Sequence, residues 1–300
     1  MLPLALKSNN SGGTRPTIEI SVAGGPKIPV LFDTGSQGLR VFDNSVGTAG
    51  ISETATRNEV TFGSGNKFIG NRATAPAIIA GKATAGPISI QLVHQVVCIE
   101  THPNCAGRHG FSSYIAKQGV RGILGAGLGS GDVFSPLLQL QGGYPKSYTI
   151  ALRGSASNVT LNAPITSPAG SFPIPQADNP SHANGSPAWS DQRIPGCWAY
   201  NSAARSCVST VFDTGATHTS TDTSVPGTST ASVPSDTVLS LATSATDKPI
   251  WRISSATGVI EIRDHVSAAA VNTGISLFKT FDVTFNVANG MVVLTTAPRH

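Results

Sequence analysis

Two stretches of the sequence repeat each other and decide the fold: LFDTGSQGLRV (31–41) and VFDTGATHTS (211–220). In each, an apolar run leads into Asp-Thr-Gly, and the two aspartates, Asp33 and Asp213, are 180 residues apart. Such an internal repeat indicates two similar halves, each ending a strand in an acidic turn. The plain alternative is that Asp-Gly-type turns often end strands. The whole triplet occurs twice, each time after an apolar run, and this argues against coincidence.

Two carboxylates from two similar halves can meet at a pseudo-twofold axis. Like charges a few ångströms apart cannot both ionise, so such a pair holds a proton between its members. One carboxylate can then act as a base toward a bound water, and the other as an acid toward a substrate carbonyl. The repeat therefore predicts Asp33 and Asp213 as a catalytic pair.

The three residues after each aspartate fit supporting roles. The hydroxyls of Thr34 and Thr214 can hydrogen-bond across to the backbone of the other half, and the two glycines permit a tight turn. Ser36 can donate a hydrogen bond to the first aspartate, whereas the side chain of its counterpart, Ala216, has no donor. The supporting residues expected from the sequence are Thr34, Gly35, Ser36, Thr214, Gly215 and Ala216.

The composition favours a folded chain rich in strands. Of the 300 residues, 12% are charged and 39% hydrophobic, which excludes a typical disordered chain. The 32 glycines and 20 prolines interrupt helices often. The net charge is +4 without any Lys/Arg run, so no nucleic-acid partner is expected. No segment reaches the roughly 18 apolar residues of a membrane span, and the apolar run of the first ten residues is too short for a signal peptide.

Strands and turns dominate the local patterns. Strands are predicted at 17–22, 28–32, 58–62, 87–97, 146–152, 157–162, 281–287 and 291–296. Between the last two, Asn289-Gly290 predicts a type I′ turn. Short helices are expected only at 134–140 and 236–241. The proline-rich segment 163–195 is interpreted as a surface loop or a crossing between two lobes, and 217–235 as a loop. These patterns predict an all-β protein with a few short helices.

The sequence resembles the pepsin-like aspartic proteases over most of its length. Five motifs carry the resemblance, in the order that the family has: TIEISVAGGPKIPVLFDTGS (17–36), VTFGSG (60–65), RGILGAGLG (121–129), CVSTVFDTGAT (207–217) and NTGISLFKTFDVTFNVANGMVVLTTA (272–297). The resemblance implies a bilobal pepsin-like fold, with one β lobe over 1–160 and a second over 161–300. The richness in small residues is similar to that of the pepsin-like domains at the C-termini of mycobacterial PE_PGRS surface proteins.

The resemblance also implies an activity. The chain would be an aspartic endopeptidase that cleaves an extended polypeptide between its lobes, as a monomer, without a cofactor or metal, and open to pepstatin-like inhibitors. Residues 60–65 would form the flap, a hairpin over the substrate. The substrate-binding residues expected by matched position are Phe62, Gly63, Ser64, Ile123 and Thr217, with Phe111 and Tyr114 as further candidates that could equally belong to the core. His218 is expected to have a structural or surface role.

The chain departs from the family's pattern at three positions. The usual flap Tyr is Phe62, and the Trp that bonds it in pepsins is Arg40, so the hydroxyl and its partner are both missing. We expect Phe62 to pack on the substrate and Arg40 to face solvent. Ala216 replaces the more common Thr, which should stabilise the anionic pair less and move the acidic limb of activity to higher pH. These changes leave an alternative open: a weak or inactive pepsin-fold binding module at the cell surface. A structural or adhesive surface domain is the remaining alternative.

The four cysteines form two local pairs, Cys98 with Cys105 and Cys197 with Cys207. Their close spacing favours a disulfide within each pair, although four cysteines allow three connectivities. Two disulfides would indicate an extracellular or cell-surface location. The first pair allows a second interpretation, a zinc site that also uses His94, His102 and His109, and free thiols are the third.

Overall fold

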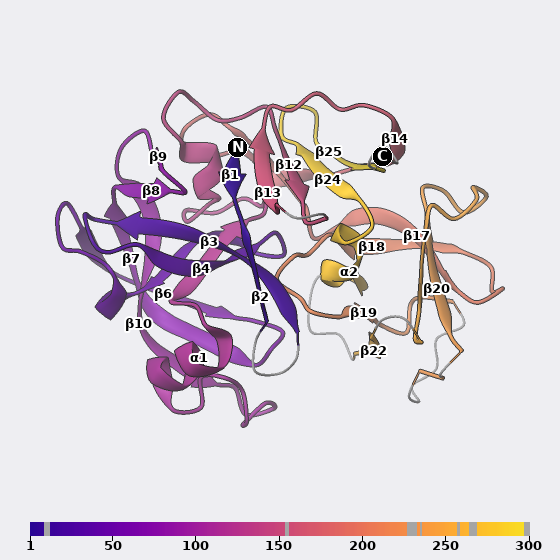
Figure 1. Ribbon diagram of the computed structural model, residues 1–300, viewed down its shortest axis with the longest axis horizontal. Helices are drawn as coiled ribbons and strands as arrows, with labels where there is room; N and C mark the ends of the chain where they lie inside the picture. The colour runs from indigo at the N-terminus through magenta and orange to yellow at the C-terminus, as the bar shows by residue number, and fades with distance from the viewer. Residues whose placement is uncertain are drawn as a thin grey trace.

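The computed structural model describes residues 1–8, 13–153, 156–226, 233–234, 236–256, 259–263 and 269–296. Three large sheets organise these residues, and Figure 1 shows two of them as the left and right lobes, with the third above and between them. The expected all-β, bilobal architecture is confirmed. The division at 160/161 stays a prediction.

The left lobe in Figure 1 is built on a ten-stranded sheet. Its order is β6-β7-β10-β5-β11-β4-β3-β8-β9, and β2 pairs with β3. The strands are β2 (Ala5–Ser8), β3 (Thr14–Val22), β4 (Ile28–Asp33), β5 (Gln37–Phe42), β6 (Ser52–Thr61), β7 (Asn66–Ala75), β8 (Ala77–Ile79), β9 (Lys82–Ala83), β10 (Ile88–Cys98) and β11 (Gly122–Ala126).

The right lobe is built on a seven-stranded sheet in the order β21-β20-β17-β18-β23-β19-β22. Its strands are β17 (Ile194–Tyr200), β18 (Ser206–Val211), β19 (Thr219–Thr221), β20 (Val238–Ala242), β21 (Trp251–Ser254), β22 (Ile260–Ile262) and β23 (Val271–Asn272).

A six-stranded sheet joins the two ends of the chain, in the order β1-β13-β12-β24-β25-β14. It consists of β1 (Leu2–Pro3), β12 (Ser147–Ala151), β13 (Asn158–Leu161), β14 (Pro168–Pro173), β24 (Asp282–Asn286) and β25 (Met291–Thr295). A small hairpin pairs β15 (Gln176–Ser181) with β16 (Pro187–Trp189). The described helices are short: α1 (Gly110–Gln118), α2 (Gly274–Phe278) and the 3₁₀ turns η1 (Asp43–Ser45) and η2 (Pro136–Gln139).

Most predicted strands lie where the sequence placed them, and the exceptions have physical causes. The helix expected at 236–241 is wrong, because Val238–Ala242 pairs with β17 on one side and with β21 on the other. The helix expected at 134–140 is only the 3₁₀ turn Pro136–Gln139. The proline-rich segment 163–195 is not merely a loop, since it contributes β14 to the six-stranded sheet. Part of 217–235 lies outside the described residues.

The predicted hairpin of β24 and β25 is present, but its turn differs from the prediction. Asn286 pairs with Met291, so four residues connect the strands instead of two. Gly290 has a φ of 61°, whereas Asn289 does not have the positive φ of a type I′ turn. A Cβ at Gly290 would lie 2.4 Å from the Trp189 ring, so the packing of this ring requires glycine. The Trp189 indole donates to Val287 O at 2.8 Å and fixes the turn.

Candidate active site

The two Asp-Thr-Gly loops meet where the two lobes face each other. Thr34 N donates to Thr214 Oγ1 at 3.1 Å, and Thr214 N donates to Thr34 Oγ1 at 3.0 Å. Each threonine hydroxyl also donates to a backbone carbonyl of the other half, Thr34 to Phe212 O and Thr214 to Phe32 O, both at 2.7 Å. Both threonines are buried. The near-identical contacts give the two loops twofold symmetry and hold them rigidly together.

Gly35 and Gly215 are needed less for the backbone turn than for the close approach of the opposite carboxylate. A Cβ on Gly35 would lie 2.3 Å from Asp213 Cγ, and a Cβ on Gly215 would lie 2.4 Å from Asp33 Oδ1. Neither glycine is among the residues with positive φ. Each carboxylate therefore lies against the glycine of the opposite loop, in space that any side chain would take.

Asp33 is a buried acid that keeps its proton to an unusually high pH. It is 6% exposed, and it accepts hydrogen bonds from Gly35 N at 2.8 Å and from Ser36 Oγ at 2.6 Å. Burial raises the pKa of Asp33 to about 7; the negative charge of Asp213 and a hydrogen bond with it act in the same direction, while Ser36 and Gly35 oppose them. Around neutral pH and below, the pair thus holds a proton.

Asp213 is surrounded by N–H donors. Gly215 N donates to its Oδ1 at 2.6 Å and Ala216 N to the same oxygen at 3.2 Å. On the other side, Asn272 Nδ2 donates to Oδ2 at 2.6 Å. Both oxygens of Asp213 therefore accept N–H hydrogen bonds.

The Asn272 contact changes the interpretation of Ala216. The sequence predicts that Ala216 leaves Asp213 without the side-chain donor that Ser36 gives Asp33. The structure instead supplies a donor from β23, which lies parallel to β18 and places Asn272 beside the second loop. Sequence reasoning missed Asn272 because it is 59 residues from Asp213. The only local signal was that Asn272 is the polar residue that directly follows an apolar run and opens the closing motif.

A cavity of about 560 Å³ surrounds the two carboxylates and takes lining residues from both lobes. All the substrate-binding residues expected from the sequence line it: Phe62, Gly63, Ser64, Ile123 and Thr217. Of the two further candidates, Tyr114 also lines it, whereas Phe111 stacks on Phe42 with ring centroids 4.4 Å apart. His218 contacts Glu261 at 2.7 Å.

The hairpin of β6 and β7 reaches over this cavity. Its turn is closed by Phe62 N to Asn66 O at 2.9 Å and by Gly65 N to Phe62 O at 2.8 Å. The Phe62 ring packs edge-on against Phe68 at a centroid distance of 5.0 Å, so it is partly committed to the core of the lobe. Ile99 N donates to Gly65 O at 3.0 Å and supports the turn from the loop that follows β10.

Arg40 does not face solvent as expected. Its side chain lies in the same cavity, is 6% exposed, and donates to the carbonyls of Gln37 and Gly38. Burial lowers the pKa of Arg40 to about 10, and the charge of Asp33 opposes this shift. The guanidinium therefore remains a buried cation beside the carboxylate pair.

Two neighbouring polar residues reach the site from the segment before β17. Gln192 Nε2 donates to Gly35 O at 2.9 Å. Asp191 lines the cavity, and its carboxylate accepts a hydrogen bond from Leu128 N; burial raises the pKa of Asp191 to about 7. Sequence reasoning placed both residues in a linker, because nothing local indicates contacts across 63 and 157 residues.

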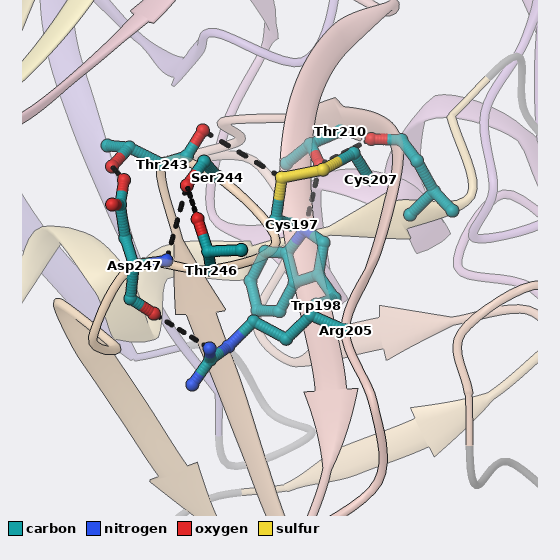
Figure 2. The surroundings of a disulfide bond; sticks show 10 residues. Cys197, Trp198, Arg205, Cys207, Thr210, Thr243, Ser244, Thr246 and Asp247 are labelled. Atoms are coloured by element: carbon teal, nitrogen blue, oxygen red, sulfur yellow. Dashed lines mark hydrogen bonds between the residues drawn. A yellow bond between two sulfur atoms is a disulfide. The ribbon is translucent and has the colours of Figure 1, made fainter.

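Both expected disulfides, Cys98–Cys105 and Cys197–Cys207, are present. Disulfide-bonded sulfurs are not thiolates, so the zinc interpretation of the first pair is wrong. His94, which that interpretation used, contacts Asp43 at 2.9 Å and Glu53 at 2.6 Å. Figure 2 shows Cys197–Cys207 between β17 and β18, beside Trp198, whose indole donates to Thr210.

Within the described ranges, no group of three His, Cys, Asp or Glu side chains could hold a metal ion. None of the described helices is long and apolar enough to cross a membrane.

Comparisons of the sequence and of the structure with known proteins both find aspartyl peptidases or domains like them. A family model described as the PE-PGRS C-terminal aspartyl peptidase-like domain matches residues 2–295. Among solved structures, the aspartic proteinase from Irpex lacteus is similar, with a TM-score of 0.60 and 15% sequence identity over 98% of this chain and 96% of that one. At this identity the likeness shows the fold. None of the curated proteins matches the chain.

Proposed function

Because the chain belongs to the PE-PGRS C-terminal aspartyl peptidase-like domain family, we propose that it is an aspartic endopeptidase whose catalytic pair is Asp33 and Asp213. The observation that carries the proposal is the meeting of the two Asp-Thr-Gly loops, which bond to each other through Thr34 and Thr214 and place each carboxylate against the glycine of the opposite loop. The pKa of Asp33, raised by burial and by the charge of Asp213, supports a proton held by the pair. One proton is then available for a substrate carbonyl while a carboxylate remains free to act as base.

Within this proposal, the raised pKa of Asp33 assigns the roles of the two acids. Asp33 keeps its proton up to about pH 7, so it donates that proton to the carbonyl oxygen of the scissile peptide. Asp213 takes a proton from the water held between the two acids, and that water attacks the carbonyl carbon. In the resulting gem-diol, Asp213 gives its proton to the leaving nitrogen and Asp33 takes a hydroxyl proton as the C–N bond breaks, which yields a carboxyl group and an amine and restores both acids.

The cavity fits an extended polypeptide as the substrate. Gly63 and Ser64 line one side of it with little side chain, so their backbone is open to pair with a peptide strand. The residue pairs Phe62 with Ile123 and Ala216 with Thr217 offer apolar contacts on opposite lobes. We propose that the protein acts as a monomer, needs no cofactor, and binds pepstatin-like inhibitors in this cavity.

An extracellular or cell-surface location belongs to the same proposal. Two disulfides support it, because such bonds persist in oxidising compartments.

The test is cleavage of a mixed peptide library by three variants. Asp33→Asn and Asp213→Asn should each lower kcat/KM at least about 100-fold, because each removes one proton-transfer partner without changing the shape of the side chain. Asp282→Asn, which alters a carboxylate in the six-stranded sheet, is the matched control and should keep full activity. Circular dichroism should show the same fold in all three.

A binding module remains the second candidate, because Phe62 lacks the flap hydroxyl and its ring packs on Phe68. The two candidates differ in one outcome. If the wild-type protein cleaves no library peptide at any pH and still binds peptides in the cavity, the peptidase proposal is rejected and the binding module is favoured.

A further inference from the structure

Arg40 lies in a row of side chains on one face of the ten-stranded sheet. In register, Arg40 is opposite Gln91 of β10 and Ile123 of β11, and Ile123 is opposite Leu31 of β4. Directly opposed residues of neighbouring strands project to the same face. Leu31 and Ile123 belong to an apolar cluster that also contains Phe42, Phe68 and Tyr114. Arg40 therefore places a cation within an apolar surface.

The guanidinium of Arg40 is not fully satisfied by the protein. Its Nη1 donates to the backbone carbonyls of Gln37 and Gly38. Its Nε is buried and has no hydrogen-bond partner among the described residues. A buried donor without an acceptor is costly, so an acceptor from outside the chain would stabilise this side chain.

The cavity brings such an acceptor within reach. Arg40 lines the same cavity as Asp33, Phe62 and Ile123, close enough to Asp33 for the carboxylate charge to act on its pKa. Below about pH 7, Asp33 holds a proton and offers Arg40 less negative charge. A planar guanidinium is best matched by a carboxylate, which can accept two parallel N–H hydrogen bonds.

We propose that Arg40 is a specificity-determining residue, which selects peptides with a glutamate or aspartate side chain within two residues of the cleaved bond. The apolar neighbours Leu31 and Ile123 contact the methylene part of that side chain, and Arg40 binds its carboxylate. This inference rests on the proposed peptidase function, which it deepens by naming the substrate class.

The experiment compares matched peptides that differ only in Glu against Gln, at each of the two positions on either side of the cleaved bond. At about pH 5.5 the glutamate is ionised, and the two side chains have nearly the same shape. At one position, kcat/KM for the Glu peptide should exceed that for the Gln peptide about tenfold or more. A ratio near one at all four positions would overturn the inference and leave the peptidase proposal intact.

Variants separate Arg40 from a general effect of positive charge. Arg40→Met keeps most of the length and removes the charge, so it should bring the Glu/Gln ratio close to one, and Arg40→Lys should keep an intermediate ratio. Arg72→Gln is the matched control, because Arg72 pairs with Asp132 outside the cavity lining, and it should keep the wild-type ratio. An unchanged ratio in folded Arg40→Met would contradict the inference. Should Arg40→Met fail to fold, a Glu/Gln ratio that is lower in Arg40→Lys than in the wild-type protein supports the inference. Equal ratios in these two proteins contradict it.

Binding provides a readout that does not depend on catalysis. The Asp213→Asn protein should bind the fluorescently labelled Glu peptide about tenfold more tightly than the Gln peptide in a polarisation titration. If the wild-type protein cleaves nothing but this difference holds, the peptidase proposal fails and the role of Arg40 stands. Equal affinities, or no binding of either peptide, would reject the role of Arg40.

Discussion

At the scale of single residues, Asn272 completes the surroundings of Asp213. Ser36 gives Asp33 a side-chain donor, and Ala216 cannot do the same for Asp213. The Asn272 amide takes this place at 2.6 Å, and its own Oδ1 accepts Gly274 N at 2.9 Å, which fixes the orientation of the amide. The two halves are thus alike in hydrogen-bonding function although the donors come from unrelated positions in the sequence.

Replacement of Asn272 by alanine tests this contribution. Asn272→Ala should lower kcat about tenfold, because the carboxylate pair loses a charge-stabilising hydrogen bond. The acidic limb of the pH–activity profile should also move to higher pH, since the anionic form of the pair is less stabilised. The measurement is kcat and kcat/KM over a pH series.

A second change provides the control. Adding Ala216→Thr to Asn272→Ala restores a hydroxyl donor at the position where pepsin-like proteases commonly have one, and should recover part of the lost activity. If Asn272→Ala changes stability but neither kcat nor the pH profile, Asn272 has only a structural role.

At the scale of elements, β17 and β18 form the framework of the second loop. They pair in antiparallel register from Ile194 with Thr210 to Trp198 with Ser206, and Cys197 lies directly opposite Cys207. Asp213 follows two residues after the end of β18. In Figure 2 the disulfide lies beside the Trp198 indole, which donates to Thr210, and Arg205 donates to Asp247 O, so this end of the hairpin is fixed from two sides.

Removing this disulfide should destabilise the fold. Changing Cys197 and Cys207 together to alanine should lower the free energy of unfolding by about 2–3 kcal/mol, because the unfolded chain is no longer closed into a loop. Urea denaturation measures the change. The matched variant lacks Cys98 and Cys105, whose separation is 7 residues against 10, and it should lose a similar or slightly smaller amount. An unchanged midpoint in the first variant would contradict the prediction.

Local patterns predicted the elements best where the decisive contacts are short-range. Alternating residues and turn signals found the hairpins of β3 with β4 and of β24 with β25. The prediction for 236–241 failed, because β20 pairs with β17, which lies far upstream in the chain, as well as with β21, the next strand. Helix α1 was missed, since its sequence GFSSYIAKQ mixes glycine and serines with few apolar residues.

The residues of the candidate site show the same difference between short-range and long-range contacts. The Asp-Thr-Gly triplets and the flap turn could be named from the sequence, because each is a continuous motif. Asn272, Asp191 and the buried orientation of Arg40 could not, because each depends on which distant segment of the chain lies next to it in the fold.

At the scale of the whole molecule, buried acids couple folding to pH. Burial raises the pKa of both Asp33 and Asp191 to about 7 from the ordinary value of 3.8. Between these values the folded protein binds more protons than the unfolded chain, so these two groups make stability fall as pH rises. Their contribution is fully present below about pH 4 and is lost as pH approaches 7.

The prediction is a pH-dependent free energy of unfolding. In the wild-type protein, these groups should lower it as pH rises from about 4 to 7, each by at most roughly 1.4 kcal/mol per pH unit. Asp33→Asn and Asp191→Asn should each flatten the profile, because the amide does not titrate. Denaturation at several pH values measures this, with Asp282→Asn as the control. If the free energy of unfolding changes with pH in the same way in the wild-type protein and in Asp33→Asn, the raised pKa assigned to Asp33 is wrong.

The six-stranded sheet has a consequence for the order of assembly. The strands of the left lobe are all encoded before residue 127, whereas this sheet needs β1 from the start of the chain and β25 from residues 291–295. All residues up to Thr295 must therefore be synthesised before this sheet can form completely. A nascent chain that ends before β24 can complete the ten-stranded sheet but not the six-stranded one, so the two sheets close at different stages of synthesis.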